Sequence, residues 1–437
     1  MRVSLAISFG TVPTQRLDRT SWPAPARPVR IVHLGLGAFS RSHLAAYTAS
    51  AELAGGWGIS GFTGRSPRLA AALAPQQGLY ALVERGPAAD NVSVVDVVVE
   101  VHGGGELAAL TAALASAETA VVTLTVTEAG YRPPAAAERA AAGAGRGLST
   151  VGERLAQGLV ARRNAGAGPL ALVSLDNLAA NGTVLRELVL DELARIDPQG
   201  PEWAQRQLSF VSTSVDRITP RTTAEDRGLV ERELGLRDEA PVVCEPFSDW
   251  VLCGAFPAGR PRWEDAGARF VDDIGPWEAR KLWLLNGGHC LLAYMGLGRG
   301  HETVAQAVGD RELAASLERY WDLAASLLAG GELLELDAYR AALRERFANA
   351  RIGYPLTQIA SDGLEKLRNR VVPVIVAARQ AGADASPALA IVQAWADWLI
   401  GDPVRAASDQ NGEALRPALA AGGEQARHAL FELLEIF

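Results

Sequence analysis

The sequence is poor in cysteine and contains no long apolar run. Its 437 residues include three cysteines, Cys244, Cys253 and Cys290, with no CxxC pair, so neither a zinc knuckle nor a redox dithiol is predicted. No apolar run reaches the roughly 18 residues that a transmembrane helix needs, and the short, interrupted apolar stretch at the N-terminus is unlike a signal peptide. A low, odd cysteine count is typical of a reducing compartment, so we expect a soluble, cytoplasmic protein.

Long basic runs are also missing. The formal net charge is -8, and a mildly acidic chain without a Lys/Arg cluster carries no electrostatic footprint for nucleic acid. The expected partner is therefore a small molecule rather than a nucleic acid or a membrane, and an anionic substrate would need a local cationic pocket. The pattern leaves the oligomeric state open, and a monomer is compatible with it.

The chain is too long for one ordinary core, which predicts two domains. Residues 1–28 form an irregular arm interrupted by prolines. Residues 29–274 alternate strands with helical stretches, which predicts an α/β domain with a doubly wound, Rossmann-like parallel sheet. Residues 275–437 are rich in Ala, Leu, Glu and Arg with helical periodicity, which predicts a mainly α-helical second domain.

Within these domains the apolar runs locate individual elements. Strands are expected at residues 29–34, 57–63, 92–101, 120–127, 170–175 and 208–212, and helices at 42–53, 311–328 and 389–399. The short apolar stretch at 371–377 fits either a strand or a helix, and the Ala/Gly-rich stretch at 135–148 fits a flexible loop or a frayed helix.

A glycine pair follows the first predicted strand. Gly35 and Gly37 stand where a dinucleotide-binding fold needs one glycine for a tight turn and one for the approach of the pyrophosphate. The helix that follows would present its N-terminus to the phosphates. Ser40 replaces the third glycine of the fingerprint, so a merely structural turn is the alternative.

The second strand ends without the acidic residue that usually binds the ribose of NAD. The residues there are Gly64, Arg65 and Ser66. Arg65 and Ser66 could hold the 2′-phosphate of NADP, or Arg65 could stack on adenine or lie in solvent. The sequence therefore predicts NAD with NADP as an open alternative.

The most informative segment starts at Lys281. On an α-helix at about 100° per residue, Asn286 lies about 140° and His289 about 80° from Lys281, so the three polar groups share one sector of an apolar helix. Gly287 and Gly288 would cost roughly 1 kcal/mol each relative to Ala. We expect them to allow the close approach of a ligand or of a neighbouring backbone.

These residue types suit hydride-transfer chemistry. Oxidation of a secondary alcohol needs a base for the hydroxyl proton, and a lysine can act as one if desolvation lowers its pKa. Asparagine amides supply neutral donors for the developing alkoxide. The chain carries no Cys/His set suited to a catalytic zinc, so a metal-independent dehydrogenase is expected.

The sequence resembles the long-chain mannitol dehydrogenase family, which includes mannitol 2-dehydrogenases, fructuronate reductases and arabinitol dehydrogenases. The resemblance runs from about residue 29 to at least residue 370. Besides the lysine helix, its landmarks are residues 35–43, 78–80, 125–131, 176–178, 181–182, 215–220 and 245–247.

The resemblance implies roles for the residues of the site. Lys281 corresponds to the family's general base, and Asn177 and Asn286 to the pair that stabilises the alkoxide. His289 corresponds to a substrate-binding histidine, and Glu278 to a glutamate linked to proton exchange with solvent. The candidate cofactor contacts are Gly35, Gly37, Phe39, Ser40, Arg65, Thr125 and Asp216.

The far end of the substrate site departs from the family pattern. Lys366 matches a lysine that contacts substrate hydroxyls, but Gln358 stands where some mannitol dehydrogenases have arginine, and Leu364-Glu365 and Arg368 replace other motif residues. We expect Gln358 and Lys366 to bind substrate, with a surface role for Lys366 as the alternative. These departures put mannitol specificity in doubt.

The sequence thus predicts an NAD(P)-dependent oxidoreductase that interconverts a secondary alcohol of a linear polyol or sugar acid and its 2-keto form. A fructuronate reductase is the alternative within the family. A non-catalytic nucleotide-binding sensor is the alternative of another class, based on the departures at Ser40, at Gly64-Arg65, and at Gln358 and Leu364.

Overall fold

The computed structural model describes residues 14–51, 55–64, 66–131 and 150–436. The chain divides into two compact units. The first comprises Met1–Glu84, Asp90–Cys244 and Gly254–Phe270, and the second Arg85–Ala89, Glu245–Cys253 and Val271–Phe437. The domain boundaries at residues 28/29 and 274/275 stay predictions. The stretch at 135–148, expected to be a loop or a frayed helix, lies outside the described residues.

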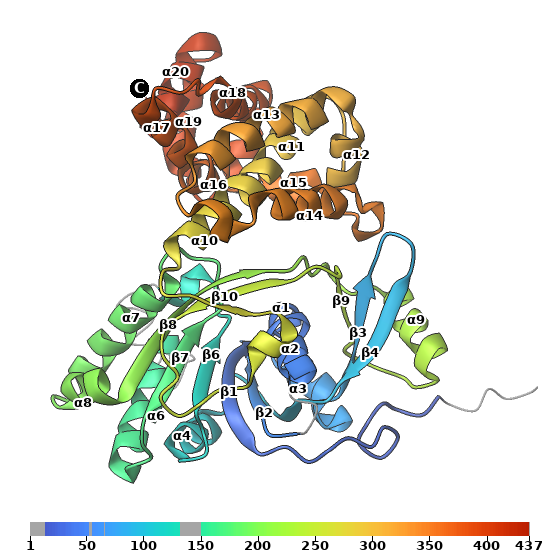
Figure 1. Cartoon of the computed structure of the whole chain (residues 1–437), viewed down its shortest axis with the longest axis vertical. Helices are drawn as coiled ribbons and strands as arrows, with labels where there is room; N and C mark the ends of the chain where they lie inside the picture. The colour runs from blue at the N-terminus through green and yellow to red at the C-terminus, as the bar shows by residue number, and fades with distance from the viewer. Residues whose placement is uncertain (1–13, 52–54, 65, 132–149, 437) are drawn as a thin grey trace, which may run out of the picture. The chain divides into compact units, whose positions relative to one another are not determined.

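Six strands of the first unit form a parallel sheet (Figure 1). In spatial order they are β8 (Leu208–Asp216), β7 (Leu170–Ser174), β6 (Val121–Leu124), β1 (Val29–Leu36), β2 (Gly58–Thr63) and β5 (Val98–His102). Every residue of β2, β6 and β7 is buried, as expected for a parallel sheet that is covered on both faces. The predicted Rossmann-like α/β class is confirmed.

Helices of the first unit cover this sheet. They are α1 (Ala38–Ser42), α2 (Leu44–Ala51), α3 (Arg68–Leu73), α4 (Leu107–Ala115), α6 (Val151–Ala165), α7 (Asn181–Ile196) and α8 (Gly200–Gln207). Helix α9 (Ala224–Leu234) packs instead on a second, smaller sheet of the same unit. Apolar side chains of α4, α6 and α7 pack on those of β1, β6 and β7 in one buried cluster. Helix α6 begins at a capping box in which Thr150 and Glu153 bind each other's backbone N–H groups.

The strand expected at residues 92–101 is wrong as a single element. The structure has two strands there, β4 (Asp90–Val95) and β5. β4 belongs to a separate three-stranded sheet, in the order β4, β3 (Tyr80–Arg85) and β9 (Val242–Cys244). The break is at Asp96, whose carboxylate accepts hydrogen bonds of 3.0 Å from Arg27 and whose carbonyl accepts one of 2.8 Å from Arg19. These long-range contacts have no local sequence signal.

The second unit is helical apart from β10 (Asp249–Cys253). Its helices are α10 (Gly275–Arg280), α11 (Gly287–Gly298), α12 (Val304–Gly309), α13 (Arg311–Leu327), α14 (Leu336–Ala348), α15 (Leu356–Ala360), α16 (Gly363–Arg370), α17 (Val372–Ala381), α18 (Ser386–Gly401), α19 (Gly412–Ala420) and α20 (Gly423–Leu433). The predicted mainly helical character is confirmed, and the ambiguous stretch at 371–377 is helical in α17.

Helix α11 is the central helix of this unit. Every residue from Gly287 to Tyr294 is buried, and α11 packs against α13, α15 and α18. Large aromatic side chains, among them Tyr320, Trp321 and Trp395, are fully buried around it. A helix that is apolar on all sides belongs in the centre of a core, so the residues just before and within α11 are held rigidly. Among the described residues, no helix is both long and apolar enough to cross a membrane.

Candidate active site

The carboxyl ends of the parallel strands bring one group of candidate residues together in the first unit. The register pairs Leu34 of β1 with Leu124 of β6, and Leu124 with Ser174 of β7. Gly35 and Thr125 therefore lie next to each other just beyond the paired ends. The strand order reverses between β1 and β6, and ligands of open α/β sheets bind at this kind of switch point.

The two glycines after β1 serve different purposes. Gly35 has φ +95°, and a Cβ there would lie 2.1 Å from the carbonyl oxygen of Thr125, so the close approach of β1 and β6 requires glycine. Gly37 has φ −143°, and a Cβ there would lie 3.5 Å from the carbonyl oxygen of Gly35. Apart from chain neighbours, no other atom of the described residues lies within 4 Å, so a ligand such as a dinucleotide phosphate can approach the backbone.

Ser40 stands where the fingerprint has its third glycine, and its side chain forms a hydrogen bond within the turn. Its hydroxyl accepts a hydrogen bond of 3.0 Å from the backbone N–H of Gly37, and its side chain is buried. Phe39 stacks on His43 with ring centroids 5.1 Å apart. Serine at this position therefore stabilises the turn, which accounts for one departure from the fingerprint. Arg65 lies outside the described residues, and its neighbour Ser66 is exposed.

Thr125 is held by a buried histidine. The Thr125 hydroxyl donates to the carbonyl of Gly35 at 2.9 Å and lies 3.1 Å from Nε2 of His33, whose Nδ1 is 2.8 Å from the hydroxyl of Thr123. Burial lowers the pKa of His33 to about 4, so the ring is neutral at pH 7. The neutral ring lets one nitrogen accept while the other donates.

Asp176 organises the loop that carries Asn177. Its carboxylate accepts hydrogen bonds from the N–H groups of Val126 and Thr127, at 3.0 and 2.8 Å, and from the hydroxyl of Tyr131 at 2.7 Å. Burial raises the pKa of Asp176, and the two backbone donors and Tyr131 oppose that shift. Asn177 itself is exposed. From the sequence, Asp176 was recognised only as part of a family motif. A carboxylate directly after a predicted buried strand could also have indicated that it binds the neighbouring loop.

Asp216 is the last residue of β8 and is buried. Next to it, Arg217 donates a hydrogen bond of 2.6 Å to the carbonyl of Ser42 and pairs with Glu84. Arg217 therefore ties the end of β8 to the end of α1, close to the glycine turn.

In the second unit, Lys281 and Asn286 are the first and last residues of a π-helical turn, η4 (Lys281–Asn286), between α10 and α11. The N–H of Gly287 bonds back to the carbonyl of Leu282, five residues earlier. Because the hydrogen bonds of such a turn join residues five apart rather than four, each residue turns by less than on an α-helix, and Lys281 and Asn286 face more nearly the same side. The separation of about 140° expected from a regular α-helix is wrong here, and the two groups are closer in direction.

Neighbouring aromatic side chains explain the π-helical turn. The hydroxyl of Tyr320 donates to the carbonyl of Trp283 at 2.9 Å, and Nε1 of Trp321 donates to the carbonyl of Leu284 at 2.8 Å. A Cβ on Gly287 would lie 2.1 Å from the Tyr320 hydroxyl, and one on Gly288 3.1 Å from Trp321 Nε1. The two glycines thus admit side chains of α13, and not the ligand or backbone expected from the sequence.

Lys281, Asn286 and His289 are all buried. The His289 ring packs against Phe347 at 4.6 Å and Tyr354 at 5.6 Å between centroids. Glu278 is partly buried on α10, three residues before Lys281. Between them, Arg280 pairs with Asp249 at 2.6 Å and donates to the carbonyl of Leu334 at 2.9 Å. The start of the lysine turn is therefore fixed by a buried ion pair.

Gln358 and Lys366 lie on α15 and α16. The Gln358 side chain is exposed, whereas Lys366 is partly buried. The ammonium of Lys366 donates to the carbonyls of Ile359 and Gln358, at 3.0 and 3.4 Å, and to the hydroxyl of Ser361 at 3.3 Å. Burial lowers the pKa of Lys366, and the nearby Arg370 lowers it further. The three donors of the ammonium stabilise the C-terminal end of α15.

One compositional signal was missed in the sequence. Of the 42 Lys and Arg residues, only Lys281 and Lys366 are lysines, which leaves 40 arginines (42 − 2). Arginine stays protonated in proteins, whereas a lysine can lose its proton when buried. A chain that uses arginine almost everywhere keeps lysine at two positions, and both were candidates on other grounds.

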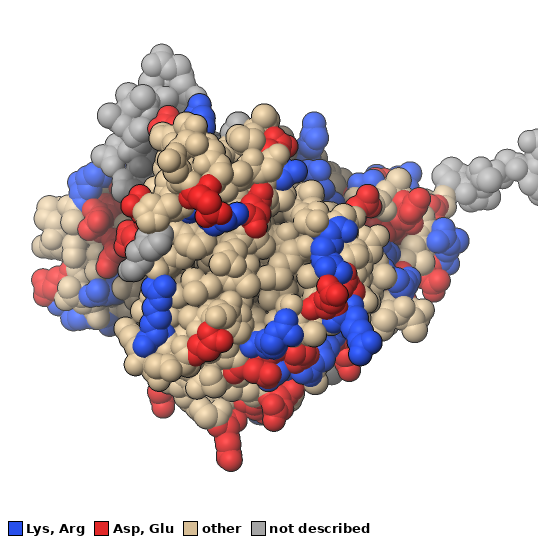
Figure 2. All heavy atoms as spheres, turned by 90° about the horizontal axis from the view of Figure 1, so that it is seen from above, with Lys and Arg blue, Asp and Glu red and all other residues tan. Residues whose placement is uncertain are grey.

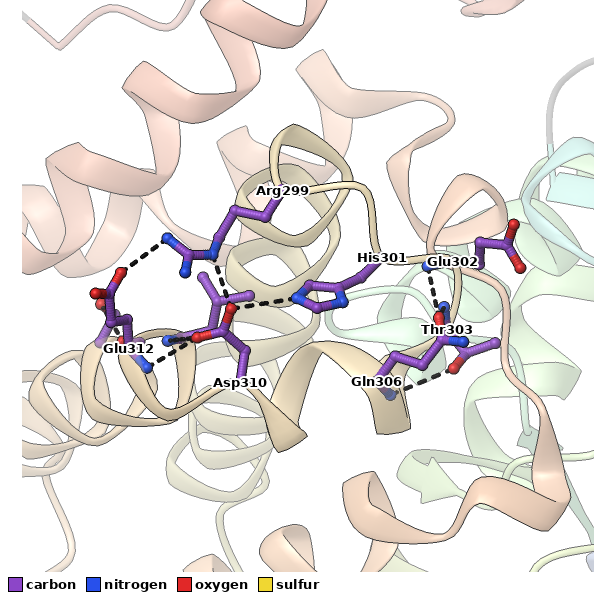
Figure 3. Close-up of polar contacts among 9 residues, drawn as sticks. Arg299, His301, Glu302, Thr303, Gln306, Asp310 and Glu312 are labelled. Carbon is purple, nitrogen blue, oxygen red and sulfur yellow. Dashed lines mark hydrogen bonds and ion pairs between the residues drawn. The ribbon is translucent and has the colours of Figure 1, made fainter.

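The surface offers fewer candidates. Among the described residues, no group of three or more His, Cys, Asp or Glu side chains could hold a metal ion. A hollow is lined by residues 300–302, 305–306 and 309–310, and Figure 3 shows the polar contacts that several of these residues make. There Asp310 accepts from Arg299 at 2.8 Å and lies 3.3 Å from His301. On the face drawn in Figure 2, charges of both signs surround an uncharged middle, and no field of one sign stands out.

Comparisons with known proteins identify the family of the chain. A family model described as the mannitol dehydrogenase Rossmann domain matches residues 29–265, and one described as the mannitol dehydrogenase C-terminal domain matches residues 273–437. The chain belongs to the mannitol dehydrogenase family. The predicted resemblance is thereby confirmed.

Individual members of the mannitol dehydrogenase family match over most of the chain. D-mannonate oxidoreductase of Escherichia coli (strain K12) is 35% identical over 81% of this chain and 76% of its own. The polyol:NADP oxidoreductase of Gluconobacter oxydans (strain 621H) is 34% identical over 77% and 73%. The structure of Pseudomonas fluorescens mannitol 2-dehydrogenase in ternary complex with NAD and D-mannitol superposes with a TM-score of 0.79 at 29% identity, covering 97% of this chain and 94% of that one.

Proposed function

We propose that the protein is a NAD(P)-dependent oxidoreductase that interconverts a secondary alcohol of a linear polyol or sugar acid and its 2-keto form. The observation that carries the proposal is the buried π-helical turn that presents Lys281 and Asn286 on one face, with His289 at the start of α11. Family membership supports it, because the matched relatives are named as oxidoreductases of a polyol or a sugar acid.

Lys281 is the proposed general base. A bound nicotinamide would supply the acceptor for the hydride that leaves the alcohol carbon. The hydroxyl proton passes to the neutral Lys281 amine, so the ketone forms as the ammonium forms, and reduction reverses both transfers. Burial disfavours the charged ammonium, which is the property a base needs near neutral pH.

Neutral donors stabilise the alkoxide that develops as the proton leaves. We assign this role to the amides of Asn286 and Asn177, because a neutral donor does not compete with Lys281 for the proton. His289 orients the substrate oxygen, and Glu278 exchanges the proton of Lys281 with solvent. Gln358 and Lys366 are assigned to the far end of the substrate, Gln358 through its exposed amide.

The dinucleotide is assigned to the carboxyl edge of the parallel sheet. The space beside Gly37 supports a phosphate there, and Phe39, Ser40, Gly35, Thr125 and Asp216 line or support the same edge. Relatives named for NAD and for NADP both match the chain, so Arg65, with its capacity to bind a 2′-phosphate, is the residue assigned to the choice between them.

Substitution of Lys281 tests the base. Lys281→Ala should lower kcat by roughly 10²–10⁴-fold or more, and Lys281→Arg should be as slow, because a guanidinium does not act as a base at neutral pH. Cofactor affinity, measured by fluorescence titration with NADH and NADPH, should stay near wild type. Near-wild-type turnover by either variant would refute the role.

A screen with both cofactors tests the activity itself. Hexitols, pentitols and hexonates would be offered for oxidation, and ketoses and keto-uronates for reduction. Turnover of any of them would exclude a nucleotide sensor. Absence of turnover with all of them, by a protein that binds NADH or NADPH, would favour the sensor over the enzyme.

A further inference from the structure

Helix α16 carries two cations on one side. Lys366 and Arg370 are four residues apart, so they lie one above the other on the same face. Helix α16 packs against both η4 and α11, the two elements that carry Lys281, Asn286 and His289. Both cations are partly buried. The proposed catalytic groups therefore have a cationic neighbour within their own unit.

Arg370 lies directly against the catalytic segment. Its Nη1 is 3.9 Å from Sγ of Cys290, the residue after His289. The Tyr320 hydroxyl is 2.9 Å from the carbonyl of Trp283 in the π-helical turn and 3.5 Å from the carbonyl of Arg370. One buried side chain thus touches both η4 and the end of α16, so the end of α16 that carries Arg370 is packed against the segment of the proposed catalytic groups.

The two cations differ in what their donors contact. The three donors of Lys366 are directed to Gln358, Ile359 and Ser361. Within the part of the chain that the structure describes, the guanidinium of Arg370 has one hydrogen-bonding contact, a long one to the Cys290 sulfur. Arg370 is therefore the cation of this pair whose donors remain available for a ligand.

No carboxylate of the described residues forms an ion pair with Arg370. The nearby Asp409 accepts from the N–H groups of Gly363 and Asn411, at 2.9 and 2.8 Å, and Asp362 accepts from that of Gln410 at 3.1 Å. In the same unit, the buried Arg280 and Arg346 each have a carboxylate partner. A partly buried guanidinium without an anion is costly unless a ligand supplies one.

We propose that Arg370 binds the carboxylate of a sugar-acid substrate and sets a preference for hexonates and keto-uronates over neutral polyols and ketoses. This inference rests on the proposed dehydrogenase function and names its substrate class. A guanidinium binds a carboxylate through two parallel N–H···O bonds. A terminal CH₂OH group is uncharged and cannot form this ion pair.

The test compares D-mannonate with D-mannitol, which differ by a carboxylate in place of one terminal CH₂OH. Wild type should have the higher kcat/KM for D-mannonate. Arg370→Gln should reduce the mannonate/mannitol ratio of kcat/KM by about ten- to a hundredfold, the effect of losing hydrogen bonds to a charged group, mainly through the KM for D-mannonate. The KM for D-mannonate should also rise more steeply with ionic strength in wild type than in the variant.

Arg319→Gln is the matched control, because Arg319 is exposed on α13 of the same unit and donates a hydrogen bond to Ser316. The control should keep the wild-type ratio. Turnover of D-mannitol without a preference for D-mannonate, or an equal loss on both substrates in Arg370→Gln, would overturn the inference and leave the dehydrogenase function standing. Failure of wild type on every substrate in the screen would overturn the function itself, and the inference with it.

Discussion

The hydroxyl of Tyr320 donates a hydrogen bond of 2.9 Å to the carbonyl of Trp283, in the middle of the π-helical turn that carries Lys281. Burial raises the pKa of this tyrosine far above its usual value, so the hydroxyl remains a donor at any physiological pH. The indole N–H of Trp321 likewise donates a hydrogen bond to the carbonyl of Leu284. The two side chains thus supply hydrogen-bond donors to carbonyls of the π-helical turn. The aromatic side chains of Tyr320 and Trp321 therefore stabilise the turn that carries the proposed base.

Gly287→Ala should disturb this arrangement. The new Cβ would lie 2.1 Å from the Tyr320 hydroxyl, and overpacking of this kind costs typically about 1–3 kcal/mol. Both the free energy of unfolding, measured by urea denaturation, and kcat should fall. Gly298→Ala is the matched control at the end of the same helix, where no atom lies within 4 Å of the new Cβ. It should be neutral or slightly stabilising, and an equal effect of the two changes would contradict the argument.

The two glycines after β1 should respond differently to alanine. Gly35→Ala forces a Cβ into the Thr125 carbonyl at φ +95° and should lower the free energy of unfolding by at least about 1–3 kcal/mol. Gly37→Ala should fold with a Tm near wild type, because the Cβ meets no atom closer than 3.5 Å. Its Kd for NADH should nevertheless rise about tenfold, the size of a lost hydrogen bond to a charged group. Unchanged NADH affinity in a folded Gly37→Ala protein would argue against a phosphate at this turn.

The buried pair of Arg346 and Glu245 should dominate the stability of the segment that follows β9. Two hydrogen bonds of 2.9 and 2.8 Å join them, and both side chains are almost fully buried. Glu245→Gln leaves a buried guanidinium without its counter-charge, which costs about 3–5 kcal/mol. Glu318→Gln removes a carboxylate from Arg340 and Arg344 at the surface and should cost no more than about 1 kcal/mol. The free energies of unfolding of both variants can be measured by chemical denaturation. Similar losses of unfolding free energy in the two variants would contradict an effect of burial.

Because of His33, the free energy of unfolding should fall in mild acid. Its folded pKa of about 4 lies below the unfolded value of about 6.5. The unfolded chain therefore binds the proton more readily between these values, and the contribution is complete above pH 6.5 and is lost as the pH falls towards 4. Between pH 7 and 5 this amounts to about 2 kcal/mol.

His33→Asn should reduce the difference in unfolding free energy between pH 7 and pH 5 by that amount, as measured by urea titration at each pH. His428→Gln, at an exposed position of α20, should keep the wild-type difference. A His33→Asn protein with the full wild-type pH dependence would show that this histidine is not the group responsible.

Much of the fold followed from local patterns. Short continuous apolar runs between turn residues, such as residues 170–174, predict buried strands, and the alternation of these runs with helices implies a parallel sheet. Helix α13 was predicted within one residue of its observed end, because its apolar period is regular and Asp310 caps it. The strands β3 and β9 were missed, and residues 92–101 were misread, because pairing between distant segments decided those elements.

The sequence alone indicated the candidate residues: a glycine turn after the first strand, and Lys281, Asn286 and His289 in an apolar segment. It also determined the family, because these landmarks come in a specific order. Only the tertiary structure decided how the residues are presented. The carbonyls of the π-helical turn accept hydrogen bonds from side chains 37 residues further along the chain. The periodicity of the local sequence therefore does not predict this turn. The same holds for Arg370: its charge is visible in the sequence, but its place against Cys290, and the absence of an ion-pair partner among the described residues, depend on how α16 packs on α11.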